Sequence, residues 1–338
     1  MTTTLPIYQR SDFQSDQEVR WCPGCGDYTV LASVQGFMAQ LGVKRENLVF
    51  ISGIGCSSRF PYYMNTYGMH TIHGRAPAIA SGLAASRPDL SVWVVTGDGD
   101  ALSIGGNHLI HALRRNMNLK ILLFNNQIYG LTKGQYSPTS PPGEKTKSSP
   151  HGSIDHPFNP VALALGAEAS FVARTLDMDR THTQEMLAAA YNHPGSALIE
   201  IYQKCAVFND GAFDQLTGKA TRDENRIMLE AGKPIVFGPD SERAVVWRDG
   251  DAVIVDTASV SPSEILVHDP SRESSAVAYA LSRLSHGPSG PTPLGIFRDV
   301  KRSVYDVEMS AQLVAAAASQ GSGDIDELLA SHGTWTVD

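Results

Sequence analysis

The chain has 338 residues, of which 42% are hydrophobic and 18% charged, and its formal net charge at pH 7 is −8. This composition is typical of a globular protein, and the length allows one large α/β domain or two ordinary ones. The negative charge argues against nucleic-acid binding. No apolar run approaches the roughly 20 residues of a membrane span, and the N-terminus has no apolar signal core. We therefore expect a cytoplasmic protein.

Helical and strand-like patterns alternate through the first 210 residues. Helices are indicated by apolar residues at helical spacing, and strands by short β-branched runs. Alternating strands and helices predict the α/β fold class with a doubly wound parallel sheet. In chain order the predicted elements are a polar extended arm (1–20), a helix (28–41), a strand (47–52), a helix (76–86), a strand (90–96), a helix (105–116), a strand (119–124), a helix (158–166), a strand (168–174), a helix (179–193) and a strand (197–202).

One segment inside this region has a different composition. Residues 136–156 are rich in Pro, Ser, Thr, Gly and Lys, which cannot bury much apolar surface. Loops of this length tend to be lids, partner-binding segments or disordered, although a passive surface loop is an equal alternative. We therefore expect a long surface loop.

The alternation ends near residue 210. Residues 248–251, Arg-Asp-Gly-Asp, stand between two β-branched runs and predict a hairpin, and residues 308–319 form an Ala-rich helical pattern. We expect residues 1–210 to form the α/β domain. Residues 211–338 are then an irregular, peripheral extension that packs on the core or on a partner subunit.

Two polar side chains follow neighbouring strands of the predicted sheet. Asp98 lies in a Gly-Asp-Gly turn after the strand at 90–96, and Asn126 in an Asn-Asn pair after the strand at 119–124. The carboxyl ends of neighbouring parallel strands are where open α/β sheets bind ligands. Mg²⁺ takes oxygen ligands, which Asp98, the Asn126 amide and the Ile128 carbonyl can supply beside a diphosphate. A lone Gly-Asp-Gly is more often an ordinary turn, so the hypothesis rests on the spacing of the two motifs.

The chain has four cysteines, Cys22, Cys25, Cys56 and Cys205. Cys22-Pro-Gly-Cys25 can form a thioredoxin-type redox pair, but this leaves Cys56 and Cys205 unexplained. Four thiols also suit a structural zinc site, or an iron–sulfur cluster, which permits dispersed ligands. Cys56 and Cys205 each follow a predicted strand, so we expect both near the same sheet edge as Asp98. This placement favours a cluster and leaves zinc open.

The string from Gly97 to Asn116, followed by Phe124 to Ser140, resembles the β subunit of 2-oxoacid:ferredoxin oxidoreductases, particularly the 2-oxoglutarate type. The resemblance covers most of residues 17–210 and the Trp-Thr-Val at 335–337. It implies the thiamine-diphosphate-binding form of the α/β fold, with thiamine diphosphate, Mg²⁺ and one 4Fe–4S cluster held by the four cysteines.

The resemblance also implies the reaction. Members of the family decarboxylate a 2-oxoacid oxidatively, here 2-oxoglutarate, to give succinyl-CoA from coenzyme A together with CO₂. The electrons pass through the cluster to ferredoxin. The same chemistry on pyruvate or another 2-oxoacid is the alternative within this class.

Site residues follow from the positions of the family motifs. His73 is a candidate catalytic donor to a phosphate or to the reacting oxygen, although a lone His is often structural. Arg59 lies three residues beyond Cys56 and can pair with the distal carboxylate of 2-oxoglutarate, or it can be a surface Arg. Leu131 would supply an apolar wall to the substrate. The residues implied to contact the cofactor are Ile54, Gly55, Cys56, Ser57, His73, Gly99, Asp100, Gly130 and Leu131, with Asp98, Asn126 and Ile128 on Mg²⁺.

One required group is absent from the motifs. Thiamine enzymes place a carboxylate against the aminopyrimidine, and in this family the other subunit supplies it. We therefore expect half of an active site, paired with a larger α subunit in an α2β2 assembly and with ferredoxin as electron acceptor. The alternatives are a non-redox thiamine decarboxylase subunit, which needs no four cysteines, and a zinc-stabilised interaction subunit without catalysis.

Overall fold

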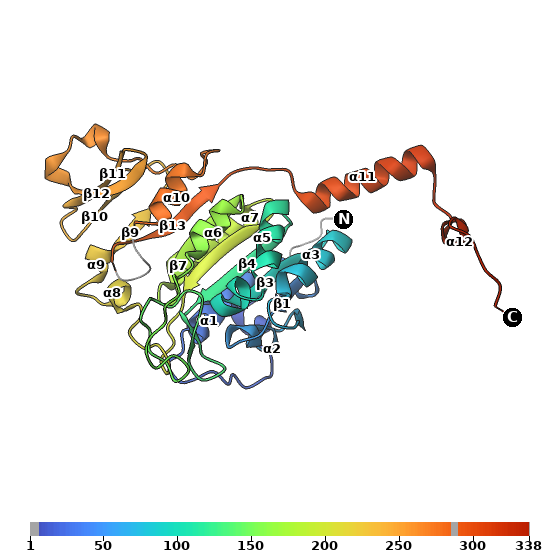
Figure 1. The fold of residues 1–338 in the computed structure, drawn as a ribbon, viewed down its shortest axis with the longest axis horizontal. Helices are drawn as coiled ribbons and strands as arrows, with labels where there is room; N and C mark the ends of the chain where they lie inside the picture. The colour runs from blue at the N-terminus through green and yellow to red at the C-terminus, as the bar shows by residue number, and fades with distance from the viewer. Residues whose placement is uncertain (1–6, 285–289, 338) are drawn as a thin grey trace.

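The computed structural model describes residues 7–284 and 290–337. Its centre is an eight-stranded, mostly parallel sheet in the order β2-β1-β3-β4-β8-β7-β13-β9 (Figure 1). Within the described part of the chain, the one antiparallel pairing in this sheet is that of β13 with β7, and β9 runs parallel to β13. The strands are β1 (Leu48–Ser52), β2 (Tyr67–His70), β3 (Ser91–Gly97), β4 (Leu119–Asn125), β7 (Phe171–Leu176), β8 (Ala197–Tyr202), β9 (Arg226–Leu229) and β13 (Thr292–Asp299).

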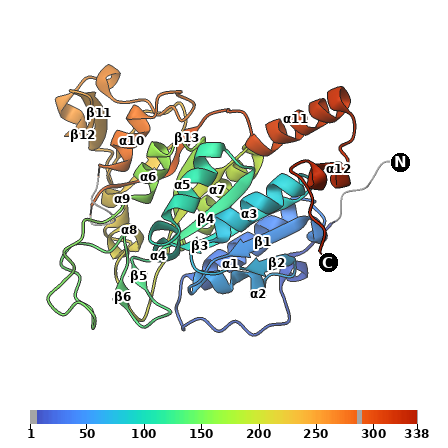
Figure 2. The ribbon, with the colours of Figure 1, turned by 45° about the vertical axis from the view of Figure 1, so that its right-hand side comes forward.

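Helices cover both faces of this sheet (Figure 2). Helix α1 packs against α7 on one face, while α3, α5, α6 and α10 form a contiguous layer on the other. Successive strand residues point to opposite faces, so Trp93 and Val95 join the first core and Val94 the second. The helices of these layers are α1 (Asp27–Gln40), α3 (Ala76–Ser86), α5 (Gly106–Arg115), α6 (Pro160–Gly166), α7 (Arg180–Asn192) and α10 (Ala276–Ser282).

The doubly wound parallel sheet expected from the sequence is therefore confirmed, with differences at its edges. The strand expected at 168–174 begins at Phe171, because the chain first turns at Glu168 with a φ of 61°. The arm before residue 20 is not fully extended, since Arg10–Phe13 forms a 3₁₀ turn that buries Phe13 completely. Strand β2, which is exposed at all four positions, was not predicted because an edge strand without a buried face shows no alternation.

The residues after 210 contribute to the sheet and also lie beyond it. Strands β9 and β13 extend its edge, while β10 (Val236–Phe237), β11 (Arg243–Arg248) and β12 (Asp251–Asp256) form a separate antiparallel sheet. The hairpin predicted at 248–251 is confirmed, with positive φ at Asp249 and Gly250. Besides α10, the described residues of this region form the short helices α8 (Asp214–Thr217), α9 (Arg222–Asn225) and α12 (Ile325–Ala330) and the longer helix α11 (Tyr305–Gln320).

Helices α11 and α12 extend away from the body of the molecule (Figure 1). Apart from the first turns of α11, their residues are exposed. A division of the chain near residue 210 remains a prediction, because the later strands pair with the earlier sheet. Among the described residues, no helix combines the length and apolarity needed to cross a membrane.

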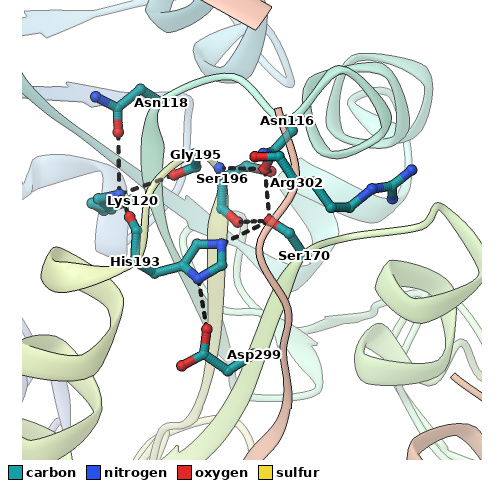
Figure 3. A network of polar contacts seen from close by, with 9 residues as sticks. All are labelled: Asn116, Asn118, Lys120, Ser170, His193, Gly195, Ser196, Asp299 and Arg302. Carbon is teal, nitrogen blue, oxygen red and sulfur yellow. Dashed lines mark hydrogen bonds and ion pairs between the residues drawn. The ribbon is translucent and has the colours of Figure 1, made fainter. Parts of the chain in front are cut away.

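A polar network joins the edge of the sheet at which the parallel strands begin (Figure 3). His193 Nδ1 lies 2.7 Å from Asp299 Oδ1, and its Nε2 lies 2.8 Å from Ser170 Oγ. These three residue types also form hydrolase triads, but Ser170 is completely buried and its hydroxyl lies 2.6 Å from Asn116 Oδ1. Lys120 Nζ donates to the carbonyls of His193 and Gly195 nearby. The network therefore ties β13 to the parallel strands and leaves no exposed nucleophile.

Candidate active site

Two adjoining pockets lie at the opposite edge, where β1, β3, β4 and β8 end. Figure 2 shows α4 (Asp98–Leu102) and the hairpin of β5 (Ile128–Tyr129) and β6 (Gln135–Tyr136) beyond the same ends of β3 and β4. The carboxylate pocket is lined by all the residues that were expected to contact cofactor and metal: Ile54, Gly55, Cys56, Ser57, His73, Asp98, Gly99, Asp100, Asn126, Ile128, Gly130 and Leu131. The cysteine pocket is lined by Cys22, Cys25, Cys56 and Cys205 with Arg20, Arg59, Asn126, Gly130, Leu131, Lys133 and Gln203 among others.

Asp98 is the first residue of α4 and is 2% exposed. The hydroxyls of Ser137 and Thr139 both donate to its Oδ2, each at 2.6 Å. Burial raises the pKa of Asp98 to about 6, although these hydrogen bonds favour the ionised form. A buried carboxylate of this kind is stabilised by a cation in the same pocket.

Asn126 and Ile128 flank a tight turn at the end of β4. Gln127 adopts a φ of 59°, and the Ile128 amide donates to Asn126 Oδ1 at 3.1 Å. The Asn126 Nδ2 group donates to Gln203 Oε1, which leaves the amide carbonyl as the acceptor near the pocket. A carboxylate, an amide oxygen and a backbone carbonyl are hard oxygen donors, so these residues fit a cation such as Mg²⁺.

Asp100 connects three loops beneath the pocket. Its Oδ1 accepts from the backbone amides of Gly74 at 2.7 Å and Ile54 at 3.1 Å, and its Oδ2 accepts from Thr96. His73 Nδ1 lies 2.5 Å from the same Oδ1, outside hydrogen-bond geometry. Asp100 therefore positions the loops around the pocket, and His73 remains half-exposed toward the pocket that it lines.

Glycine is required at two positions in this pocket by close approach. A Cβ on Gly53 would lie 1.9 Å from Asp100 Oδ2, and a Cβ on Gly99 would lie 2.2 Å from the Tyr129 ring. The Tyr129 hydroxyl donates to the Gly99 carbonyl at 3.1 Å. The Gly-Asp-Gly turn thus brings the start of α4 against the β5–β6 hairpin.

The four cysteines are free thiols around the second pocket. Cys205 is buried, Cys25 and Cys56 are half-buried, and Cys22 is exposed. The Cβ position of Gly130 lies 3.5 Å from Cys56 Sγ and 3.7 Å from Cys205 Sγ, so a larger residue there would fill the space between these thiols. Burial, followed by the nearby Asp27 carboxylate, raises the pKa of Cys56 to about 12.

All four thiols line one open pocket. Four thiolates are the ligand set of a 4Fe–4S cluster, which permits ligands from dispersed loops, and also of a structural zinc site. The residues present therefore fit a cluster in this pocket.

Arg59 lies in the wall of the cysteine pocket, and it is not among the residues that line the carboxylate pocket. Its guanidinium donates to the backbone carbonyl of Arg20 at 3.3 Å. Leu131 lines both pockets and is 40% exposed. The structure therefore places Arg59 in the adjoining cysteine pocket, and not in the wall of the carboxylate pocket.

Three site residues were missed because they lie in the Pro/Ser/Thr-rich segment that was expected to be a surface loop. Ser137, Thr139 and Ser140 are each 3% exposed, so the start of this segment is buried, in contrast to the expectation. Thr139 Oγ1 also lies 2.9 Å from Asn125 Oδ1. The available signal was the Ser-Pro-Thr-Ser string at 137–140, which follows the Asn-Asn motif after residues 127–136, but only its contact with Asp98 reveals its role.

Comparisons with known proteins agree with this geometry. Residues 53–201 match the family described as "Thiamine pyrophosphate enzyme, C-terminal TPP binding domain". The 2-oxoglutarate oxidoreductase subunit KorB of Mycobacterium tuberculosis is 61% identical over 338 residues, covering 99% of this chain and 90% of that protein. The β subunit of 2-oxoacid:ferredoxin oxidoreductase 1 of Aeropyrum pernix is 47% identical over 190 residues, covering 56% of this chain and 60% of that one.

A solved structure extends the likeness to the whole fold. It is a 2-oxoglutarate:ferredoxin oxidoreductase from Magnetococcus marinus with 2-oxoglutarate, coenzyme A and succinyl-CoA bound. The match has a TM-score of 0.77 at 31% identity and covers 98% of both chains, so it includes most of the residues after 210. On the identity and coverage of these relatives, the chain belongs to the β subunits of 2-oxoacid:ferredoxin oxidoreductases, most similar to the 2-oxoglutarate type.

Proposed function

We propose that this chain supplies the diphosphate-binding and electron-accepting half of a 2-oxoglutarate:ferredoxin oxidoreductase. The reaction converts 2-oxoglutarate and coenzyme A into succinyl-CoA and CO₂, with electrons leaving through one 4Fe–4S cluster to ferredoxin. The observation that carries the proposal is the shared wall of the two pockets. Cys56, Asn126, Gly130 and Leu131 line both the oxygen-donor pocket and the four-cysteine pocket, so the two centres would be neighbours.

In this proposal the carboxylate pocket holds the diphosphate of thiamine diphosphate through Mg²⁺. Asp98, the Asn126 amide oxygen and the Ile128 carbonyl are the protein ligands of the metal. Thiamine diphosphate, when bound, supplies the electron sink for decarboxylation. The loop from Ile54 to Ser57 would lie along the cofactor, and its Gly53–Asp100 contact fixes where that loop starts.

His73 is the proposed proton donor of this half-site. Its ring lines the carboxylate pocket and lies against the buried Asp100 carboxylate. An imidazole N–H can donate to a phosphate oxygen or to the oxygen at the reacting carbon. Leu131, which lines both pockets, is the proposed apolar wall to the substrate.

Arg59 is the proposed partner of the distal carboxylate of 2-oxoglutarate. Its present hydrogen bond goes to a backbone carbonyl, which a substrate carboxylate can outcompete because charge-assisted bidentate bonds are stronger. Its place in the wall of the pocket that Cys56 also lines supports this assignment. The assignment distinguishes 2-oxoglutarate from pyruvate, whose methyl group needs no cation.

The cysteine pocket is the proposed site of the 4Fe–4S cluster, with Cys22, Cys25, Cys56 and Cys205 as ligands. Arg20 and Lys133 line the same pocket with exposed side chains. They provide local positive charge on a chain of net charge −8, as docking of an acidic ferredoxin requires. The aminopyrimidine carboxylate is assigned to the α subunit, since no Glu is among the described residues that line the carboxylate pocket.

The test is anaerobic co-expression with the α subunit, followed by metal analysis and a panel of 2-oxoacids with a viologen dye as electron acceptor. We expect iron and acid-labile sulfide in the ratio of one 4Fe–4S cluster per β chain, and a kcat/KM for 2-oxoglutarate well above that for pyruvate. Zinc without iron would instead establish the non-catalytic alternative. Asp98→Asn should abolish thiamine-diphosphate-dependent activity, while the matched exposed variant Asp251→Asn should retain it.

A further inference from the structure

Ser137 and Thr139 both form hydrogen bonds with the same carboxylate oxygen of Asp98, the proposed metal ligand. Both hydroxyls donate to Asp98 Oδ2, and both distances are 2.6 Å. These lengths are in the range of charge-assisted hydrogen bonds to an ionised carboxylate. Neither hydroxyl donates to Oδ1, so the two oxygens of Asp98 have different surroundings.

The two hydroxyls are held in place from outside the carboxylate. The Ser137 amide donates to Ser140 Oγ at 2.8 Å, and that hydroxyl donates to the Gln127 carbonyl. The Thr139 hydroxyl shares its one proton between Asp98 Oδ2 and Asn125 Oδ1, which lies 2.9 Å away at the end of β4. The turn is therefore anchored to β4 and to the Asn126–Ile128 turn. Ser137, Thr139 and Ser140 are each 3% exposed, and these hydrogen bonds restrict their side chains, so the hydroxyls resist following Asp98 if its carboxylate rotates.

We propose that Ser137 and Thr139 are positioning residues that hold Oδ2 of Asp98 and present Oδ1 alone to the cation, which selects Mg²⁺ over Ca²⁺. Mg²⁺ is small, octahedral and takes carboxylates through one oxygen, whereas Ca²⁺ accepts more ligands and often takes both oxygens. Two hydroxyls on Oδ2 oppose two-oxygen binding. The inference rests on the proposed function in taking Asp98 as the metal ligand.

The test measures metal preference by a physical readout. The two-subunit complex, stripped of cofactor, is titrated with MgCl₂ or CaCl₂ at a fixed concentration of thiamine diphosphate, and the half-saturating metal concentration is read from the rise in Tm. The variants are Thr139→Val, Ser137→Ala and the double variant. Thr139→Ser keeps the hydroxyl, and Thr181→Val removes an exposed hydroxyl elsewhere.

We expect the ratio of half-saturating Ca²⁺ to Mg²⁺ to fall by about tenfold or more in the double variant, because it loses two hydrogen bonds to a charged group and one such bond already changes an equilibrium by about tenfold. Each single variant should give part of this change, and Thr139→Ser and Thr181→Val should match the wild type. An unchanged ratio in Ser137→Ala and in the double variant would overturn the inference alone. A wild-type complex whose Tm responds to neither metal would overturn it together with the proposed function.

Discussion

Arg174 and Glu200 form a buried ion pair in the middle of the sheet, with Arg174 Nε 2.7 Å from Glu200 Oε2 and neither side chain more than 2% exposed. The pair is linked to the candidate metal site. Glu200 Oε1 accepts from Asn125 Nδ2 at 2.7 Å, and Asn125 Oδ1 lies 2.9 Å from Thr139 Oγ1. The second oxygen of Glu200 thus fixes the orientation of the amide that holds the turn beside Asp98.

Breaking this pair should destabilise the fold. Glu200→Leu leaves the Arg174 charge buried without its carboxylate, which costs about 3–5 kcal/mol. The exposed pair Arg248–Glu264, with atoms 4.0 Å apart, provides the control, and Glu264→Leu should cost less than about 1 kcal/mol. Denaturant unfolding of the purified chain measures both. Equal losses in the free energy of unfolding at the two sites would show that the buried pair stabilises the fold no more than the exposed pair does.

The sequence predicted those parts of the site that lie on motifs at the ends of strands. Asp98 and Asn126 line one pocket because β3 and β4 are neighbouring parallel strands, a relationship that the alternation of strands and helices already implied. Cys56 and Cys205 line one pocket for the same reason, since each follows a strand of that sheet. Position along parallel strands is therefore readable from local pattern.

The sequence did not predict features that depend on contacts between distant residues. Ser137 and Thr139 lie 39 and 41 positions from Asp98, and a hydroxyl-rich string has the same composition whether it is buried or exposed. Strand β13 pairs with β7 more than a hundred positions earlier in the chain, and no periodicity encodes that partner. The direction of Arg59 likewise depends on the 3₁₀ turn Ser57–Arg59, which the Gly-rich composition of the loop did not indicate.

A side chain at Gly53 should disrupt the loop that borders the cofactor. In Gly53→Ala the new Cβ would lie 1.9 Å from Asp100 Oδ2, so Asp100 must move and release the amides of Ile54 and Gly74. We expect a rise of about tenfold or more in the half-saturating concentration of thiamine diphosphate, since two hydrogen bonds to a charged group are affected. Gly82→Ala in α3 meets no atom within 4 Å and should raise the Tm slightly. Cofactor titration of both complexes makes the comparison, and wild-type affinity in Gly53→Ala would contradict it.

The stability of the metal-free protein should depend on pH through Asp98. Its folded pKa is raised to about 6 from 3.8, so between these values the folded chain holds a proton that the unfolded chain has lost. The contribution of Asp98 to the free energy of unfolding therefore falls as pH rises toward 6 and is constant above it. Mg²⁺ binds the ionised form, so stabilisation by Mg²⁺ with thiamine diphosphate should grow over the same window. Thermal unfolding of wild type and Asp98→Asn from pH 5 to 8 measures this, and parallel curves would contradict it.

Removing Arg59 should change substrate preference. In Arg59→Ala we expect KM for 2-oxoglutarate to rise far more than KM for pyruvate, because only 2-oxoglutarate has a distal carboxylate for the guanidinium. Activity of the two-subunit complex with a viologen dye gives both values. Equal changes for the two substrates would refute the assignment and leave Arg59 with a role in the wall of the cysteine pocket.

Charge at the mouth of the cysteine pocket should control reduction of ferredoxin without affecting a small dye. Lys133 is exposed, and its φ of 81° is a strained conformation for a residue with a side chain. The variant Lys133→Gly therefore removes the charge and also relieves the backbone strain. We expect Lys133→Gly and Arg20→Glu to raise KM for an acidic ferredoxin several-fold at low salt, with the difference from wild type shrinking as screening increases. Lys301→Glu, an exposed cation at the opposite edge of the sheet, should have no effect. Because viologen needs no docking surface, its reduction should stay unchanged in all three variants, and a parallel loss with viologen would show that the substitutions damage the cluster site instead.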